Sequence, residues 1–244
     1  MGTTGGSAMR RFWDARARED AYYFINNTLD YGDPDLDRFW ESGPEDVDKI
    51  LRLLGVGLSP ADTVVEIGCG VGRMSRAIAA RVATVRAVDV SPEMIERARD
   101  LNRSLDNVDW IVGDGGSLAG VDAGEADAVL SFVVFQHIPD PEVTLAYVRE
   151  MGRVLRPGGW AGFQVSDEPS VHARRSLSRR LRDRVAAARG RLPHGWSHPA
   201  WRGSPTDLRR LRQTAGEAGL ATERVEGRGT QFCFVLLRKS GPQV

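Results

Sequence analysis

The sequence predicts an α/β fold built on a mostly parallel sheet, and three observations support this prediction. Apolar stretches of strand length alternate with helical patterns between residues 59 and 165, as in parallel strands joined by right-handed crossovers. A glycine-rich turn follows the first apolar stretch and leads at once into a helical pattern. The chain of 244 residues is long enough for one sizeable core of this kind with additions. We therefore expect one doubly wound domain.

The order of the expected elements follows from these patterns. Strands are expected at 63–67, 84–89, 108–112, 126–132 and 159–165, with helices at 72–81, 92–102 and 141–155 between them. A later helix begins near Thr206, after a capping pattern that contains proline, and Gly219 fits its end. Residues 221–225 and 231–238 then predict a terminal hairpin.

The N-terminal part of the chain has a different pattern. Residues 1–9 are rich in glycine, threonine and serine, so we expect a disordered tail there. Residues 10–58 have a helical pattern with many aromatic side chains, and proline predicts breaks at 33–35 and 42–45. This segment is either a helical layer packed on the sheet or a lid over a ligand. The remainder, 59–244, is expected to form the catalytic domain.

A second unusual segment interrupts the alternation late in the chain. Residues 166–203 are too many for an ordinary connection between a strand and a helix. Within this insertion, residues 172–191 contain eight arginines and one acidic residue. Part of the insertion has apolar residues at helical spacing, which predicts an amphipathic helix. We interpret the insertion as a cap on the substrate side.

The most informative motif lies where the first strand ends. Glu66 is followed by three glycines spaced two apart, Gly68, Gly70 and Gly72. Glycine has no Cβ and accepts positive φ, so a ligand can approach the backbone of such a turn. The next strand ends in Asp89, at about the 20-residue spacing at which an acidic side chain meets a ribose. This order predicts an adenosine-ligand site; the alternative is a tight turn without a ligand.

The position of the third glycine distinguishes two ligand classes. The nicotinamide and flavin fingerprint has its third glycine three residues after the second, and here Arg73 occupies that position. The pattern instead resembles motif I of the class I S-adenosylmethionine-dependent methyltransferases. Segments 89–94, 110–115 and 155–159 resemble the ribose loop, the adenine loop and the turn before the fifth strand of that family. The resemblance covers most of residues 60–165 and resumes near 204.

This resemblance implies a Rossmann-like sheet of seven strands that an antiparallel strand closes, with S-adenosyl-L-methionine as the cofactor. The residues expected to bind the cofactor are Glu66, Gly68, Gly70, Gly72, Arg73, Asp89, Val90, Met94, Asp114, Gly115 and Phe132. Asp89 can accept hydrogen bonds from both ribose hydroxyls, and Asp114 can accept from the adenine amino group while the Gly115 N–H reaches the ring. The helix after the glycines favours the carboxylate of the cofactor.

The remaining cofactor residues have expected roles with alternatives. Arg73 pairs with the cofactor carboxylate or is a solvated arginine, and Glu66 accepts from the ammonium group. Val90 and Met94 supply apolar contact to the adenine, although a methionine at such a spacing is more often part of the core. Phe132 lies beside the methionine part of the cofactor or is buried in the core.

Methyl transfer from a sulfonium mainly requires alignment, and a hydroxyl acceptor also needs a base. His137, just past the fourth strand, is the candidate catalytic base; the alternative is a histidine that orders its loop. His194 and His198 in the insertion are further candidates. Asp167 and Glu168 are expected to bind a polar acceptor or to cap a helix. Aromatic faces attract a sulfonium, so Tyr22, Tyr23 and Trp40 either enclose it or pack in the core.

Composition limits the function classes. The formal net charge is zero, so no global field favours nucleic acid or a membrane surface. Two cysteines make a disulfide framework unexpected and suit a reducing, cytoplasmic location. No apolar run reaches the length of a membrane span, and no residue spacing suggests a metal site. The oligomeric state is left open.

These observations favour a methyltransferase that acts on a small-molecule acceptor, on a hydroxyl of a sugar or of a secondary metabolite. One alternative is an RNA methyltransferase that uses the arginines of 172–191 to contact phosphates. A second is a protein that binds the cofactor without catalysis. A nicotinamide-dependent reductase is a further alternative, which the early third glycine disfavours.

Overall fold

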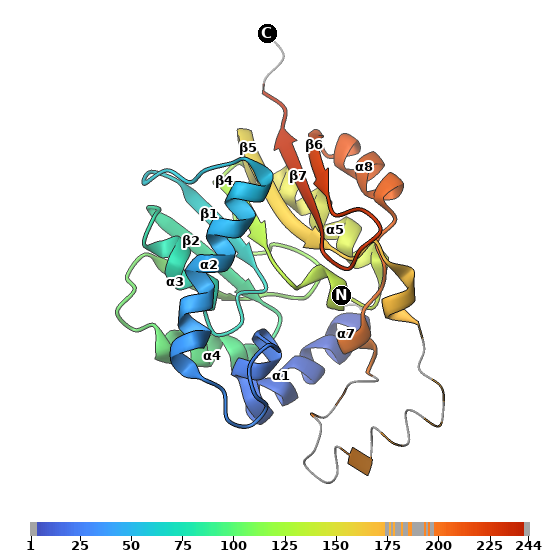
Figure 1. Ribbon diagram of the computed structural model, residues 1–244. Helices are drawn as coiled ribbons and strands as arrows, with labels where there is room; N and C mark the ends of the chain where they lie inside the picture. Colours follow the sequence, from blue (N-terminus) through green and yellow to red (C-terminus); the bar gives the residue numbers. More distant parts are fainter. Residues whose placement is uncertain are drawn as a thin grey trace.

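A computed structural model describes residues 4–173 and 198–241, together with the single residues 176, 178, 182, 185, 186, 193 and 195. The described residues form a seven-stranded sheet in the order β3-β2-β1-β4-β5-β7-β6 (Figure 1). The strands are β1 Thr63–Ile67, β2 Thr84–Asp89, β3 Val108–Val112, β4 Ala126–Ser131, β5 Leu155–Val165, β6 Leu220–Glu226 and β7 Cys233–Lys239. Strands β1 to β5 are parallel, and β7 is antiparallel to both β5 and β6. The predicted fold class is confirmed.

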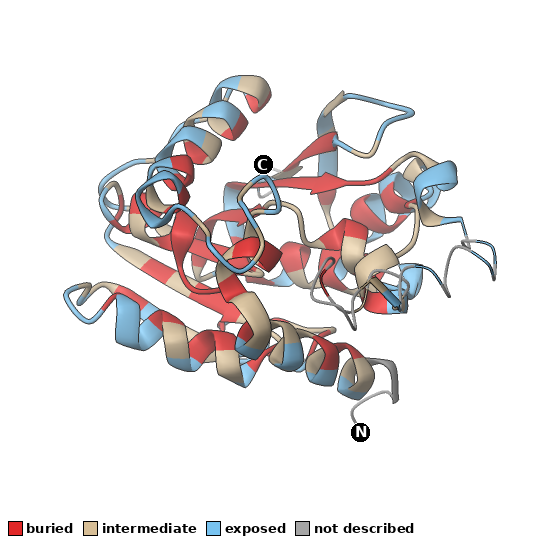
Figure 2. Ribbon diagram, turned by 60° about the horizontal axis from the view of Figure 1, so that its bottom comes forward, coloured by how far each residue is buried: buried red, intermediate tan, exposed pale blue. Residues whose placement is uncertain are grey.

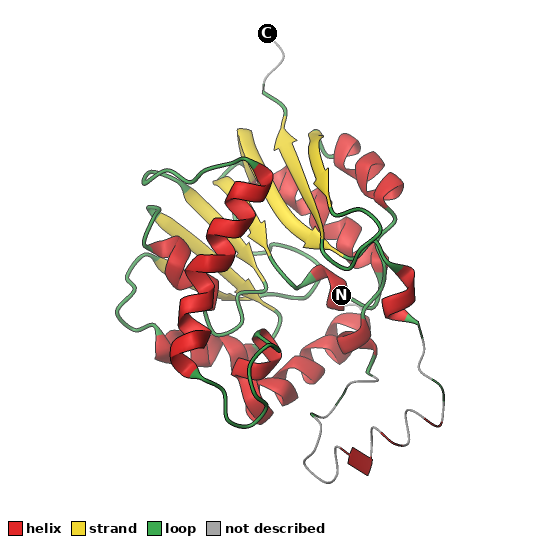
Figure 3. Ribbon diagram, in the orientation of Figure 1, coloured by secondary structure: helices red, strands yellow, loops and turns green. Residues whose placement is uncertain are grey.

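Helices cover both faces of this sheet (Figure 3). The elements are α1 Thr4–Ile25, α2 Leu36–Leu54, α3 Arg73–Ala79, α4 Pro92–Leu101, α5 Pro141–Val154, α7 Pro199–Arg202 and α8 Leu208–Glu217, with short 3-10 turns η1 Phe135–His137 and η2 Pro169–His172. Successive side chains of a strand point to opposite faces. Val64 accordingly packs with α2, α3 and α4, whereas Val65 packs with α5 and α8.

The first helix lies along the edge of the sheet where the parallel strands end, with its buried side toward the strands (Figure 2). Helix α1 is interrupted at Asp20, whose backbone leaves the helical region with φ of −165°. The Asp20 carboxylate accepts hydrogen bonds from the backbone N–H groups of Tyr23 and Gly32. The tail expected at 1–9 differs from the structure, because residues 4–9 belong to α1 and Met9 is buried.

The second helix corrects another expectation. The break predicted at 33–35 is confirmed, because Asp35 caps the N-terminus of α2 by accepting from the Arg38 N–H. The break predicted at 42–45 is wrong, because α2 continues through Pro44. Proline removes one donor and leaves a carbonyl of the preceding turn without it. The Ser42 hydroxyl donates to the Phe39 carbonyl in the same turn, at 2.7 Å, and so satisfies a neighbouring carbonyl.

Two boundaries near the C-terminal part of the sheet also differ. Strand β5 begins at Leu155 and not at 159, because Leu155 already pairs with Ala126 before the register shifts. Helix α8 is capped by Asp207, whose carboxylate accepts from the backbone N–H groups of Arg209 and Arg210. Most of the arginines and of the predicted amphipathic helix between 172 and 191 lie outside the described residues. Over the part of the chain that the structure describes, no helix is both long and apolar enough to cross a lipid bilayer.

Candidate active site

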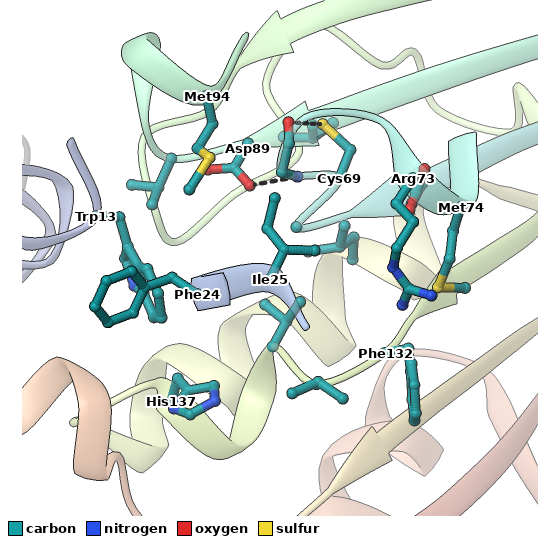
Figure 4. Close-up of a pocket in the computed structure, with 18 of the residues that line it drawn as sticks. Trp13, Phe24, Ile25, Cys69, Arg73, Met74, Asp89, Met94, Phe132 and His137 are labelled. Carbon is teal, nitrogen blue, oxygen red and sulfur yellow. Dashed lines mark hydrogen bonds between the residues drawn. The ribbon is translucent and has the colours of Figure 1, made fainter. Parts of the chain in front are cut away.

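A cavity opens at the carboxyl ends of β1, β2 and β4, between the sheet and α1 (Figure 4). This edge is where open α/β sheets bind their ligands. Its lining residues are Met9, Trp13, Phe24, Ile25, Glu66, Ile67, Gly68, Cys69, Gly70, Arg73, Met74, Val88, Asp89, Val90, Met94, Phe132, Val133, Val134, His137, Ile138 and Tyr147. Eight of the eleven predicted cofactor residues and His137 line this cavity. Gly72 is at the N-terminus of helix α3, which follows the glycine turn.

The glycine turn has the geometry that the motif predicts. Gly68, Gly70 and Gly72 have φ values of 78°, 55° and 90°, in the left-handed region that side chains disfavour. A Cβ at Gly68 would lie 2.2 Å from Val134 Cγ2, and one at Gly70 would lie 2.7 Å from Ile25 Cδ1. The bare backbone is therefore required by both the conformation and the side chains that cover it.

Asp89 ties the end of β2 to this turn. One carboxylate oxygen accepts from the Gly70 N–H at 2.9 Å, and the other accepts from the Ser91 N–H at 2.9 Å. A carboxylate has about four lone-pair sites, so both oxygens keep capacity for a ligand. Burial raises the pKa of Asp89, and these backbone hydrogen bonds oppose the shift. Asp89 is thus held in place on the cavity wall, as a ribose acceptor requires.

Glu66 is a buried carboxyl group at the end of β1. Its side chain accepts a hydrogen bond from the Ser75 hydroxyl at 2.5 Å. Burial raises the pKa of Glu66 to about 7, and the Ser75 hydrogen bond and the charge of Arg73 oppose that shift. The group can therefore hold or release a proton near neutral pH.

Arg73 is the buried cation of the cavity. Its Nη1 donates to Ser42 Oγ at 2.9 Å and pairs with Asp46 Oδ2 at 2.7 Å, so both partners come from α2. Its Nε is buried and has no hydrogen-bond partner among the described residues. The alternative of a solvated arginine is excluded by the burial of this side chain, of which 6% is exposed.

Of the residues expected beside the adenine, Val90 and Met94 line the cavity. Asp114 does not line it. The Asp114 carboxylate is exposed and accepts from the N–H groups of Gly116 and Ser117 and from the Ser117 hydroxyl. Such a local turn uses the oxygens that the adenine was expected to engage. Gly115 is buried, and a Cβ there would lie 3.0 Å from Met9 Cε, so α1 covers this loop.

His137 belongs to a chain of hydrogen bonds whose direction is fixed. The Val133 N–H, at a residue with φ of 58°, can only donate, and it does so to Gln164 Oε1. The Gln164 amide then donates to Gln136 Oε1, and the Gln136 amide donates to His137 Nε2 at 3.1 Å. His137 Nδ1 must therefore carry the hydrogen that it donates to the Trp201 carbonyl at 2.6 Å.

This network defines the protonation state of the histidine. Burial lowers the pKa of His137 to about 4, and the hydrogen bond to the Trp201 carbonyl only partly opposes the shift. The imidazole is therefore neutral at neutral pH. Its Nε2 lone pair already accepts from Gln136, so a proton can reach Nε2 only when that amide moves away.

Aromatic side chains surround His137 on the far side of the cavity from the glycine turn. The Trp13 ring contacts the imidazole edge-on with centroids 5.6 Å apart, and the Trp201 ring lies 5.2 Å from it. Phe24 packs against Trp201, and Phe132 stacks on Phe234 at 5.9 Å. Trp13 and Phe24 were not expected among the site residues. Their signal was the aromatic helical pattern of 10–58, which does not show which aromatic faces inward.

The aromatic residues that were expected at the sulfonium pack elsewhere. Tyr22 lies edge-on to Phe39, and Tyr23 lies edge-on to Phe24. The Trp40 ring stacks on the Arg76 guanidinium. None of the three lines the cavity that the described residues form. The packing alternative is therefore the one that the structure supports.

The other candidates for acceptor chemistry have structural partners. His198 stacks on Phe12 with ring centroids 4.3 Å apart and accepts from the N–H of Ala200. Asp167 accepts from the Gly229 N–H, and Glu168 caps η2. His194 lies outside the described residues.

Known proteins resemble this chain in sequence. Residues 64–159 match the family model described as a methyltransferase domain. A ubiquinone biosynthesis O-methyltransferase of Thiobacillus denitrificans is 31% identical over 171 residues, which cover 67% of this chain and 66% of that protein. A protein of the same name from Xanthomonas campestris pv. campestris is 38% identical over 102 residues, 41% of each chain. The chain thus spans less than two thirds of the length of these curated relatives.

Solved structures resemble this chain in fold. Magnesium protoporphyrin IX methyltransferase from Synechocystis PCC 6803, which was determined with bound SAH, aligns with a TM-score of 0.63 and 18% identity over 96% of this chain and 99% of that one. Phosphoethanolamine N-methyltransferase 1 from Haemonchus contortus aligns with a TM-score of 0.65 and 15% identity over 99% of this chain and 50% of that one.

Residues 64–159 thus resemble a methyltransferase domain, in a chain whose fold is that of these solved structures. The resemblance to the class I S-adenosylmethionine-dependent methyltransferases, which the motifs indicated, is confirmed. The cofactor of this class is S-adenosyl-L-methionine, and the glycine turn, Asp89 and the buried Arg73 form a site that fits it.

Proposed function

We propose that this protein transfers the methyl group of S-adenosyl-L-methionine to a hydroxyl group of a small molecule. The observation that carries the proposal is the shared cavity. Its one end has a glycine turn, the buried carboxyl group of Glu66 and the half-buried carboxyl group of Asp89. Its other end has aromatic side chains around a neutral histidine. A donor and an acceptor bound at these two ends would meet near the middle.

At the cofactor end, each group has a matching partner. Asp89 accepts from the ribose hydroxyls, and Val90 and Met94 lie against the adenine. Glu66 and Arg73 face the amino-acid part, because a buried carboxyl and a buried guanidinium match an ammonium and a carboxylate. The bound cofactor supplies a methyl group on an electron-poor sulfur. The protein holds that group in line with the acceptor, and such alignment can contribute about 7–11 kcal/mol to catalysis.

Helix α1 is proposed to act as a lid over this end. Its Arg10 donates to the Gly113 carbonyl at 2.9 Å, beside the adenine loop. One turn later, Asp14 accepts from the Ser91 hydroxyl at 2.6 Å, beside the ribose loop. Residues four apart share a helix face. One stripe of α1 therefore grips both loops that position the cofactor, and segment 10–58 combines packing with covering.

The acceptor end favours a molecule with an apolar or aromatic body. Trp13, Phe24 and Ile138 form its wall, and His137 contributes a polar edge. A sugar would need several polar partners, which this wall does not offer. The name of the related O-methyltransferases supports oxygen as the accepting atom. We therefore propose a hydroxylated secondary metabolite, in preference to a sugar, as the acceptor.

The base that takes the hydroxyl proton is proposed to be His137. This role requires Nε2 to exchange its hydrogen bond from Gln136 for one from the acceptor. The alternative is that His137 positions α7, whose Trp201 carbonyl it holds. Both roles place the acceptor against the same ring and differ only in whether the proton moves to it.

The test is a transfer assay with a methyl-labelled cofactor and a panel of hydroxylated aromatic compounds, sugars, RNA and protein. We expect label in at least one small aromatic alcohol or phenol and none in RNA or protein. Label only in RNA would favour the arginines of 172–191 as a phosphate-binding segment. Binding of the cofactor without product on any acceptor class would favour a non-catalytic role.

A further inference from the structure

The guanidinium of Arg73 reaches the cavity from the first turn of α3, next to Met74 (Figure 4). Its two polar contacts come from α2, a helix of the N-terminal segment. Nη1 donates to Ser42 Oγ at 2.9 Å and to Asp46 Oδ2 at 2.7 Å. Ser42 and Asp46 are four residues apart on one helix face, so they hold the same nitrogen from two sides.

The Ser42 hydroxyl has a fixed orientation. It donates its hydrogen to the Phe39 carbonyl at 2.7 Å, so only its lone pairs are available to other groups. These accept from Arg73 Nη1 and, at 3.3 Å, from the side-chain amide of Asn26. Ser42 is buried, and it has no freedom to turn its hydrogen toward the arginine. The hydroxyl therefore acts as a rigid acceptor for the guanidinium.

The backbone of α2 is shaped for this contact. A Cβ at Gly43 would lie 2.3 Å from the Arg73 carbonyl oxygen, so the two helices meet at bare backbone. Pro44 follows directly, and α2 continues through it. The Ser-Gly-Pro run that suggested a helix break is thus the place where α2 presses against the start of α3.

The buried Nε of Arg73 and the nearby carboxyl group of Glu66 match a ligand that carries both charges. The buried Nε has no partner among the described residues, and a buried charged donor needs one. Glu66 lies close enough for the charge of Arg73 to oppose the rise of its pKa. A free α-amino acid end carries a carboxylate, which matches the Arg73 guanidinium, and an ammonium, which matches the Glu66 carboxyl group. The cavity thus pairs a cation and an acid for a zwitterion.

We infer that Ser42 and Asp46 are positioning residues that hold Arg73 toward the carboxylate in the amino-acid part of the cofactor. This extends the function proposed above and depends on it. Helix α2 then contributes only to binding of the amino-acid part of the cofactor, while Asp89 and α1 contribute to binding of the nucleoside. The contribution of α2 should disappear for a ligand that lacks the amino-acid part.

The test compares two ligands by calorimetry. S-adenosylhomocysteine has the amino-acid part, and 5′-methylthioadenosine has the nucleoside and sulfur without it. We expect Ser42→Ala and Asp46→Asn each to weaken S-adenosylhomocysteine binding about tenfold, as for one charge-assisted hydrogen bond. Binding of 5′-methylthioadenosine should change less than about twofold. In an Arg73→Met background, Ser42→Ala should cause no further loss.

The matched control is Asp48→Asn. Asp48 lies two residues further along the same helix and pairs with Arg81, outside the cavity. The Asp48→Asn substitution removes a negative charge from α2, as Asp46→Asn does, and should leave the affinities for both ligands unchanged. Thermal unfolding of each variant verifies that it is folded.

Equal losses for both ligands, or no loss for either, would overturn the inference, because α2 would then act on the fold or not at all. The proposed function fails separately. If the wild-type protein binds neither ligand, the site does not take this cofactor.

Discussion

The two ends of the cavity are built in different ways. The cofactor end comes from one continuous stretch, residues 66–94, in which two strands and a helix place the glycine turn and Asp89. The acceptor end is assembled from α1, η1 and α7, which are far apart in sequence. The first depends on local rules of turn geometry, and the second depends on how helices pack. The comparison teaches that the glycine turn and the ribose acceptor are encoded locally, while the acceptor end and the helices that cover the donor end depend on tertiary contacts.

The largest expected effect concerns the acceptor end. We expect His137→Ala to slow turnover by about 10²–10⁴, the range for a lost general base, and to change the affinity for S-adenosylhomocysteine less than about twofold. The reason is that the imidazole lies among Trp13 and Trp201, away from the glycine turn. Steady-state kinetics and calorimetry measure the two quantities.

A second variant separates the two roles of this histidine. His137→Asn keeps an amide N–H that can donate to the Trp201 carbonyl, but it has no basic nitrogen. If turnover in the His137→Asn variant is as slow as in the His137→Ala variant, the role of His137 as the base is supported. Recovery of turnover by Asn would mean that His137 only positions α7, and wild-type turnover in the Ala variant would contradict both roles.

The next effect concerns the glycine turn. Gly68→Ala should destabilise the fold by about 3 kcal/mol, because it combines a positive φ with an added Cβ only 2.2 Å from Val134. Chemical denaturation measures this loss. Gly116→Ala is the matched control, since no atom lies within 4 Å of its added Cβ and its φ is not positive. Comparable losses in both variants would contradict the role assigned to the turn.

The contributions of Glu66 and His137 to the free energy of unfolding should change with pH in opposite directions. Glu66 has a pKa of about 7 in the fold against 4.5 ordinarily, so the folded protein binds its proton between these values. Its contribution to the free energy of unfolding therefore falls as the pH rises from 4.5 to 7. His137 has a pKa of about 4 against 6.5, so the unfolded chain binds the proton in that range. Its contribution is present above 6.5 and falls as the pH drops toward 4.

Denaturation at several pH values checks this contrast. Glu66→Gln should reduce the decline toward pH 7, and His137→Asn should reduce the decline toward pH 4, each by about 2–3 kcal/mol. A pH profile that neither substitution alters would contradict the assignment of the two groups.

The smallest effect expected is that of the ribose acceptor. Asp89→Ala should weaken binding of S-adenosylhomocysteine by about 1–3 kcal/mol through lost charge-assisted hydrogen bonds. Calorimetry measures it, and Asp109→Ala on neighbouring β3, where the side chain pairs with Arg86 at the surface, is the control. Unchanged affinity in the first variant would contradict the ribose assignment.

Most of the sheet could be predicted because its signals are local. Apolar runs between glycines and acids gave the bounds of β1, β2 and β3, and these agree with the structure. The strand β5 was predicted to begin too late because its first residues, Arg156 to Gly159, have the composition of a turn. Their pairing depends on the neighbouring strand β4, which the composition does not show.

The site residues could be predicted only where the position of a residue in a strand determines the direction of its side chain. Glu66 and Asp89 end parallel strands, so their side chains reach the edge of the sheet. Asp114 also follows a strand, but its carboxylate turns back onto Gly116 and Ser117. The inward faces of α1 and α2 depend on packing against loops that lie far away in sequence. For that reason Trp13 and the contacts of Ser42 with Arg73 were not foreseen.

The length of α1 has a kinetic consequence. Met9 near its start lies over Gly115, and Ile25 at its end lies over Gly70, so α1 covers both loops between which the nucleoside is proposed to bind. Release of a nucleoside bound as proposed then requires α1 to move away from at least one of these loops. The interruption of the helix at Asp20 lies between its two contacts. Movement of α1 is therefore expected to be a step of product release in each turnover.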